Sequence, residues 1–144
     1  YMSFVPAELV VPNPKDARRV SRAERVIKPM LLWFGLLQTY RVSVSFTDQV
    51  EGRACAIAEV VDDWPYRSVL ISYQRQWFDM ADDEGLEEKT LHEILHPLLF
   101  LRINTFLSKK DVNIEEFRDL EEDAVDAAAM WLWRLHRDPK WTPL

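Results

Sequence analysis

The chain has 144 residues, 48% of them hydrophobic, a formal net charge of −6 and a single cysteine. This size and composition suit one domain with a single core, which we expect at residues 15–137 between Pro-bearing tails at residues 1–14 and 138–144. The acidic balance argues against nucleic-acid binding, no apolar run is long enough to span a bilayer, and nothing resembles a signal peptide. Because Cys55 has no partner for an internal disulfide, we expect a cytoplasmic location.

The first predicted element is a basic amphipathic helix at residues 16–37. Residues 15–28 hold six basic and two acidic residues, a local charge of +4 that leaves −10 for the rest of the chain. Pro29 is expected to kink or break this helix, because proline lacks the backbone donor. We interpret the basic residues as a solvated helix face, with a docking site for an acidic partner as the alternative.

Three segments with strand character follow, at residues 40–46, 53–61 and 68–74. The first alternates apolar and polar residues with the period of two that is typical of a half-buried strand. Residues 47–52 predict a hairpin loop between the first two strands, and the Asp-Asp-Trp-Pro sequence at residues 62–65 ends the second. We therefore predict an α+β fold with a small sheet of three or four strands packed on helices.

The next predicted helix, within residues 91–103, contains an H-E-x-x-H motif formed by His92, Glu93 and His96. Histidines four residues apart lie on one helix face, one turn apart, so both can bind one ion. Glu93 flanks that face and is placed to hold a water molecule, which is the arrangement of a zinc peptidase helix. Pro97 predicts a kink. The acidic connection at residues 79–89 is expected to favour the helix N-terminus and carries no chemistry.

The last predicted helix begins near Asn113, where a capping box is completed three residues later, and ends at Pro139. Its expected core stripe comprises Phe117, Leu120, Ala124, Ala128, Trp131 and Leu135. Glu122 and Asp126 lie one turn apart on a neighbouring face. His136 is roughly 21 Å from Glu122 along the helix, too far to share an ion, and is expected to be a helix-end cation or a surface residue.

Together, H-E-x-x-H and a later E-x-x-x-D make residues 40–136 resemble the gluzincins, zinc peptidases of the thermolysin type. The similarity is greatest to their short members, the minigluzincins and related metallopeptidases of phages and bacteria. The resemblance implies that His92, His96 and Glu122 bind one zinc ion and that Asp126 orients His92 through its distal ring nitrogen. The metzincins are excluded, because residues 99 and 102 are leucine and arginine where that family has glycine and histidine.

Glu121 competes with Glu122 for the role of third ligand. Neighbours on a helix differ in direction by about 100°, so only one of the two can face the ion. We choose Glu122 because an aspartate follows it by one turn, and we expect zinc binding to survive Glu121→Ala.

The resemblance also implies that the strand at residues 68–74 lies at the edge of the sheet and pairs with an extended substrate. Val69, Ile71 and Tyr73 would then be substrate-binding residues. An ordinary meander strand is the alternative. The donor that stabilises the oxyanion is left open between Tyr66 and Tyr73.

The expected function is zinc-dependent hydrolysis of peptide bonds, with Glu93 as the general base that takes a proton from a metal-bound water. Peptide or protein is the expected partner, and the oligomeric state is left open. One alternative is a non-catalytic metal-binding or regulatory protein on the same scaffold. A second is a peptide deformylase, whose third ligand is a cysteine such as Cys55, although the flanking E-G-C-L-S and G-x-G-x-A-A-x-Q patterns are absent. A coincidental pair of core histidines would leave Glu122 and Asp126 unexplained.

Overall fold

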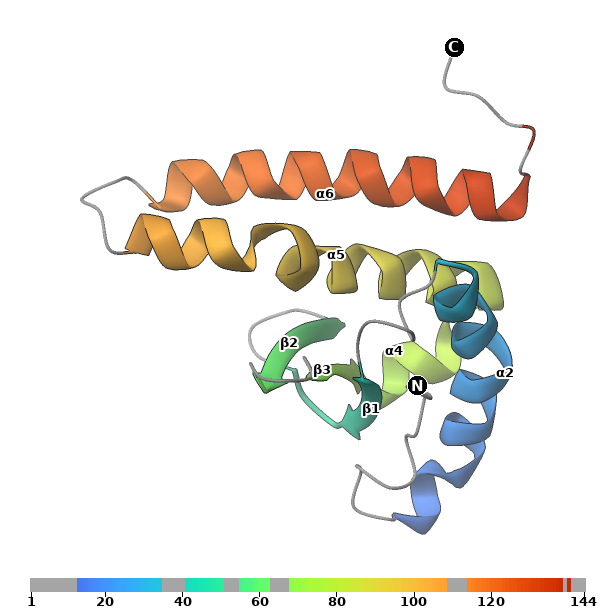
Figure 1. The fold of residues 1–144 in the computed structure, drawn as a ribbon. Helices are drawn as coiled ribbons and strands as arrows, with labels where there is room; N and C mark the ends of the chain where they lie inside the picture. Colours follow the sequence, from blue (N-terminus) through green and yellow to red (C-terminus); the bar gives the residue numbers. More distant parts are fainter. Residues whose placement is uncertain are drawn as a thin grey trace.

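The computed structural model describes residues 13–34, 41–50, 55–62, 68–108, 114–138 and 140, which form an α+β fold (Figure 1). The elements follow in the order η1 (Pro14–Asp16), α2 (Ala17–Trp33), β1 (Arg41–Thr47), β2 (Ala56–Asp62), β3 (Ser68–Gln74), α4 (Arg75–Met80), α5 (Asp83–Ser108) and α6 (Ile114–Arg137). The predicted class, with a small three-stranded sheet and helices before and after it, is confirmed. Most of both predicted tails lies outside the described residues.

The strand order is β1-β3-β2, with β3 parallel to β1 and antiparallel to β2. The predicted hairpin between the first two strands is therefore wrong, because β1 and β2 lie on opposite sides of β3. The predicted edge position of the third strand is also wrong, and so is the meander alternative. Val69, Ile71 and Tyr73 are completely buried in a strand that is paired on both sides, so they cannot pair with an extended substrate.

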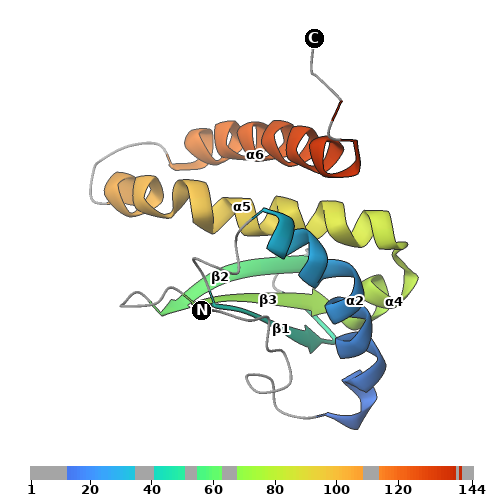
Figure 2. The ribbon, with the colours of Figure 1, turned by 45° about the vertical axis from the view of Figure 1, so that its right-hand side comes forward.

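Helices α5 and α6 are layered over one face of this sheet. Figures 1 and 2 show α6, α5 and the sheet stacked in that order, with α2 crossing near the end of α5 that lies by α4. The largest fully buried side chains come from the sheet and from α2, α4 and α5: Tyr73, Phe78, Ile27, Met30, Leu31, Ile71, Leu86, Leu91, Ile94, Val42 and Val44. The centre of the motif helix α5 is thus anchored on the core from one side and covered by α6 on the other.

Helix α5 is longer than predicted, because the acidic connection before the motif is itself helical from Asp83. The Asp82 carboxylate accepts a hydrogen bond from the Gly85 backbone N–H at 2.7 Å and so satisfies a free donor in the first turn. Acidic residues in that turn also favour the positive end of the helix dipole. Pro97 lies inside the helix and does not end it.

Helix α2 ends at Trp33, earlier than predicted, and Pro29 lies within it rather than breaking it. Its basic residues are only partly solvated. Arg19 pairs with Asp79, and Arg22 donates to Asp83 and to two backbone carbonyls at the end of α4. These contacts hold α2 against the junction between α4 and α5, so much of the basic segment stabilises the fold.

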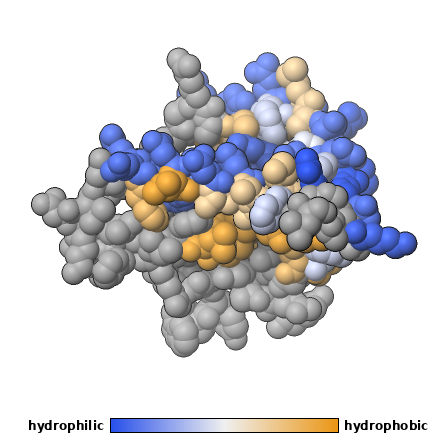
Figure 3. All heavy atoms as spheres, turned by 90° about the horizontal axis from the view of Figure 1, so that it is seen from above, coloured by the Kyte–Doolittle hydropathy of each residue, from blue (hydrophilic) through white to orange (hydrophobic). Residues whose placement is uncertain are grey.

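The face of α6 that packs against α5 differs from the predicted core stripe. The prediction of that stripe is therefore wrong in part. Glu121, Val125 and Ala129 are buried, whereas Leu120 is 65% and Trp131 is 49% exposed. The most hydrophobic stripe of the helix is the one predicted, but the buried residues in the described part of α6 are Val125, Ala129 and Glu121 with its carboxylate. Seen from the α6 side, the surface is largely hydrophilic with hydrophobic side chains exposed among the charged ones (Figure 3). No helix in the described part of the chain has the length and apolarity required to cross a membrane.

Candidate metal centre

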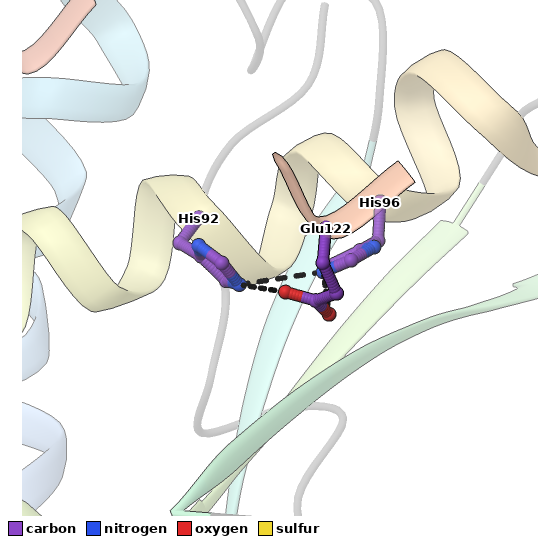
Figure 4. Close-up of side chains that lie close together, drawn as sticks. All are labelled: His92, His96 and Glu122. Carbon is purple, nitrogen blue, oxygen red and sulfur yellow. Dashed lines mark hydrogen bonds and ion pairs between the residues drawn. The ribbon is translucent and has the colours of Figure 1, made fainter. Parts of the chain in front are cut away.

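The packing of α5 against α6 brings the two sequence motifs together. In Figure 4, His92 and His96 of α5 and Glu122 of α6 point toward one another. The His92 and His96 Nε2 atoms are 3.3 Å apart, and the Glu122 carboxylate lies 3.0 Å from His96 Nε2 and 3.4 Å from His92 Nε2. Within the described ranges, this is the one group of three or more His, Cys, Asp or Glu side chains whose ligand atoms lie close enough together to hold a metal ion.

These separations match the ligand spacing of a zinc site. Zinc binds imidazole nitrogen and carboxylate oxygen at about 2.0 to 2.2 Å in a tetrahedron, so neighbouring ligand atoms are about 3.3 Å apart. The observed separations are 3.3 Å between the two Nε2 atoms, 3.0 Å from His96 Nε2 to Glu122 Oε1 and 3.4 Å from His92 Nε2 to Glu122 Oε2, so each nitrogen lies at about this distance from one oxygen of the carboxylate. The residues present therefore fit a zinc ion with three protein ligands and a fourth position for water, as in catalytic zinc sites.

The second nitrogen of each imidazole is held by a carboxylate. His92 Nδ1 lies 2.9 Å from Asp126 Oδ1, and His96 Nδ1 lies 3.0 Å from Glu121 Oε1. In a neutral imidazole, donation from Nδ1 leaves Nε2 as a bare lone pair. With this tautomer at both rings, two Nε2 lone pairs and the Glu122 carboxylate converge with no proton between them, and a cation makes such an arrangement favourable.

Sequence reasoning considered Glu121 only as a competing third ligand and missed its contact with the Nδ1 atom of His96. Its side chain is only 7% exposed and accepts from His96, while the exposed Asp126 accepts from His92 as the resemblance implied. The order of these residues in the chain could have indicated this contact. In an antiparallel helix pair, residues early in one helix lie beside residues late in the other, so His92 meets Asp126 and His96 meets Glu121. Glu121 and Glu122 thus contact different atoms of the group: Glu121 lies at His96 Nδ1, and Glu122 lies at the two Nε2 atoms.

This geometry changes the expected effect of removing Glu121. We expect Glu121→Gln to lower zinc affinity by roughly 10- to 100-fold, because an amide orients the His96 ring less strongly than a carboxylate. Asp126→Asn should lower it similarly, and Asp123→Asn, at an exposed position of the same helix, should not change it. Competition with a chromophoric chelator measures all three. Unchanged affinity in Glu121→Gln would restore the sequence-based expectation that zinc binding does not need this residue.

Glu93 lies beside the group formed by His92, His96 and Glu122 and is not part of it. Its Oε1 is 4.0 Å from His92 Nε2 and 2.9 Å from Lys89 Nζ, one turn earlier on α5. Burial is the largest single effect on Lys89 and acts to lower its pKa, but the hydrogen bond to Glu93 and the charges of Glu93 and other nearby groups together raise the pKa of Lys89 above its usual value. The ammonium group thus fixes one carboxylate oxygen of Glu93 and leaves the other available for a water molecule.

A pocket of about 340 Å³ adjoins the centre on the side of His92. It is lined by Trp77, Gly85, Glu88, Lys89, His92, Asp126 and Ala129. The His92 and Asp126 side chains belong to both the pocket and the metal centre, so a ligand in the pocket contacts the centre directly.

Other residues considered from the sequence lie elsewhere. The Tyr73 hydroxyl is 2.7 Å from the Thr90 hydroxyl, and burial raises the pKa of Tyr73 well above its usual range. The expectation that Tyr73 donates to an oxyanion is therefore wrong, because its hydroxyl is in the core; Tyr66 lies outside the described residues. Cys55 is not part of the ligand group, which removes the basis of the deformylase alternative.

His136 is partly buried rather than at the surface, which corrects its predicted position. Its ring packs against Trp33 and Phe34 with centroid separations of 5.2 and 5.8 Å. Burial lowers the pKa of His136, and the neighbouring Arg137 lowers it further, so the neutral ring serves as packing at the end of α6.

Comparison of the chain with models of protein families, with curated proteins and with solved structures gives no match. The family resemblance therefore depends on the motif residues and their spacing.

Proposed function

We propose that this protein is a zinc-dependent peptidase of the gluzincin type. The observation that carries the proposal is the convergence of His92 Nε2, His96 Nε2 and a Glu122 carboxylate at the spacing of tetrahedral zinc. Glu93, beside this group and outside it, supports hydrolysis over metal storage, because a site for storage has no need of an adjacent carboxylate.

A bound zinc ion supplies Lewis acidity, which polarises a carbonyl and lowers the pKa of a bound water to about 7. Glu93 accepts a proton from that water as its oxygen bonds to the scissile carbonyl carbon. The same carboxyl group then delivers the proton to the leaving nitrogen as the C–N bond breaks, which yields an acid and an amine. Glu121 and Asp126 hold the two histidine rings throughout, and Lys89 holds Glu93 in reach.

The partner is then a peptide or protein whose chain enters beside the pocket at His92. A cytoplasmic location is part of the proposal, because the single Cys55 has no partner for an internal disulfide and is compatible with a reducing compartment.

A non-catalytic metal-binding protein is the second candidate. It is favoured by one contact, the ion pair of Lys89 with Glu93, because an ammonium group on the general base competes with water for the carboxylate. The two candidates share the metal and differ in turnover.

Metal analysis and a peptide library test the proposal together. We expect about one zinc per chain, cleavage of a mixed peptide library detected by mass spectrometry, loss of cleavage with a chelator and recovery on adding zinc. Zinc binding without any cleavage would support the second candidate. A folded protein that refuses zinc would contradict both.

A further inference from the structure

Helix α6 carries an exposed apolar row on the side away from α5. The row consists of Leu120, Ala124, Ala127 and Trp131, which we call the outer seam. Leu120 is 65% and Trp131 is 49% exposed, and both alanines are exposed. The spacing of four, three and four residues is the heptad spacing that lines one helix along another. Figure 3 views the molecule from this side and shows hydrophobic side chains among the charged ones.

The outer seam and the metal centre lie on different faces of α6. With about 100° between successive residues, the centre of the outer seam is roughly 150° from the direction of Glu122 and Asp126. A partner that covers the outer seam therefore leaves the metal centre and its pocket open. A contact made through the outer seam therefore does not depend on the proposed function.

Charge varies along α6 in a way that selects the orientation of a partner helix. The first turn is acidic, with Glu115 and Glu116, and the last turn carries the two arginines Arg134 and Arg137. Exposed Asp119 and Asp123 extend the acidic half. A second α6 in antiparallel orientation sets each acidic half beside a basic half, whereas a parallel one sets like charges together.

The sizes of the side chains fit the same orientation. In an antiparallel pair with its twofold axis between residues 125 and 126, Leu120 of each copy faces Trp131 of the other, and Ala124 faces Ala127. Small residues at the centre allow the helix axes to approach closely, and large residues at both ends fill the wider space. The surface is thus complementary to itself, as a twofold contact requires.

We propose that this chain forms a twofold symmetric dimer through the outer seam, with the two α6 helices antiparallel. From Leu120 to Trp131 the contact is about 17 Å long. A contact between two helices of this length buries less surface area than an interface of standard size. The dimer is therefore reversible, with a dissociation constant on the order of 10 to 100 µM.

Sedimentation velocity of the full chain from about 5 to 500 µM tests the dimer, because this range spans the expected dissociation constant. We expect a shift from monomer to dimer that weakens in high salt. Leu120→Glu and Trp131→Glu should each abolish the shift while the circular dichroism spectrum stays unchanged, since both side chains are exposed. The matched control is Met80→Glu, which changes a 78% exposed apolar residue on α4 and should leave the dimer intact.

Disulfide trapping tests the orientation, in a Cys55→Ser background. Chains with Ala124→Cys mixed with chains with Ala127→Cys should cross-link to each other more than either does to itself. Preferential Ala124→Cys self-linking would mean a parallel pair and overturn the proposal. Two results of the sedimentation experiment would also overturn the proposal: a chain that stays monomeric at about 500 µM, and a dimer that still forms in both glutamate variants. Either result would mean that the outer seam does not bind a second copy of this chain.

Discussion

Glu93→Gln is expected to keep zinc and to lower peptide hydrolysis by roughly 100- to 10,000-fold, the range for loss of a general base. The amide can still accept the hydrogen bond from Lys89, so the local structure is retained. It cannot take a proton from water at neutral pH, which removes the step that activates the nucleophile. The measurements are kcat/KM on a cleaved library peptide and zinc content by elemental analysis.

The control for this variant is Glu84→Gln, an exposed position on the same helix whose loss should leave kcat/KM unchanged. Hydrolysis in Glu93→Gln within a few-fold of the unaltered protein would remove Glu93 from the catalytic role, whether or not zinc is bound.

Glu122→Ala is expected to have the largest effect on the metal. Zinc sites in small proteins provide about 10 to 16 kcal/mol over four ligands, so one ligand corresponds to roughly 2.5 to 4 kcal/mol, or about 100- to 1,000-fold in affinity. Hydrolysis should disappear with the zinc at ordinary metal concentrations. The Glu122 side chain is 55% exposed, so its removal should cost little stability, which circular dichroism and thermal unfolding can verify.

Asp123→Ala is the matched control, because it removes the next carboxylate of α6 and should keep the metal. If Glu122→Ala keeps zinc at full affinity while Glu121→Gln loses it completely, the two glutamates have exchanged roles and the helix register at the centre is different from the one described.

Local chemistry made several features predictable from the sequence alone. The positions of the helices and strands follow from the hydrophobic period, since each element forms mainly among neighbours in the chain. The pairing of His92 with His96 follows from the rise of one helical turn, and Glu122 and Asp126 follow from the same spacing on α6. These residues meet in the structure because α5 and α6 form an antiparallel pair.

Other features depend on which surfaces meet, and only the tertiary structure decides them. Strand order is one, because β3 has two ladder partners and the chain gives no local signal that β1 lies beside it in parallel. Tyr73 is therefore in the core instead of at a substrate. The burial of Glu121 and the exposure of Leu120 are a second such feature. Helix α6 packs on α5 with the face that brings Glu121 to His96, and this leaves the apolar side chain of Leu120 exposed. The sequence determined which side chains can bind a metal, and the packing of α6 determined which carboxylate holds each histidine.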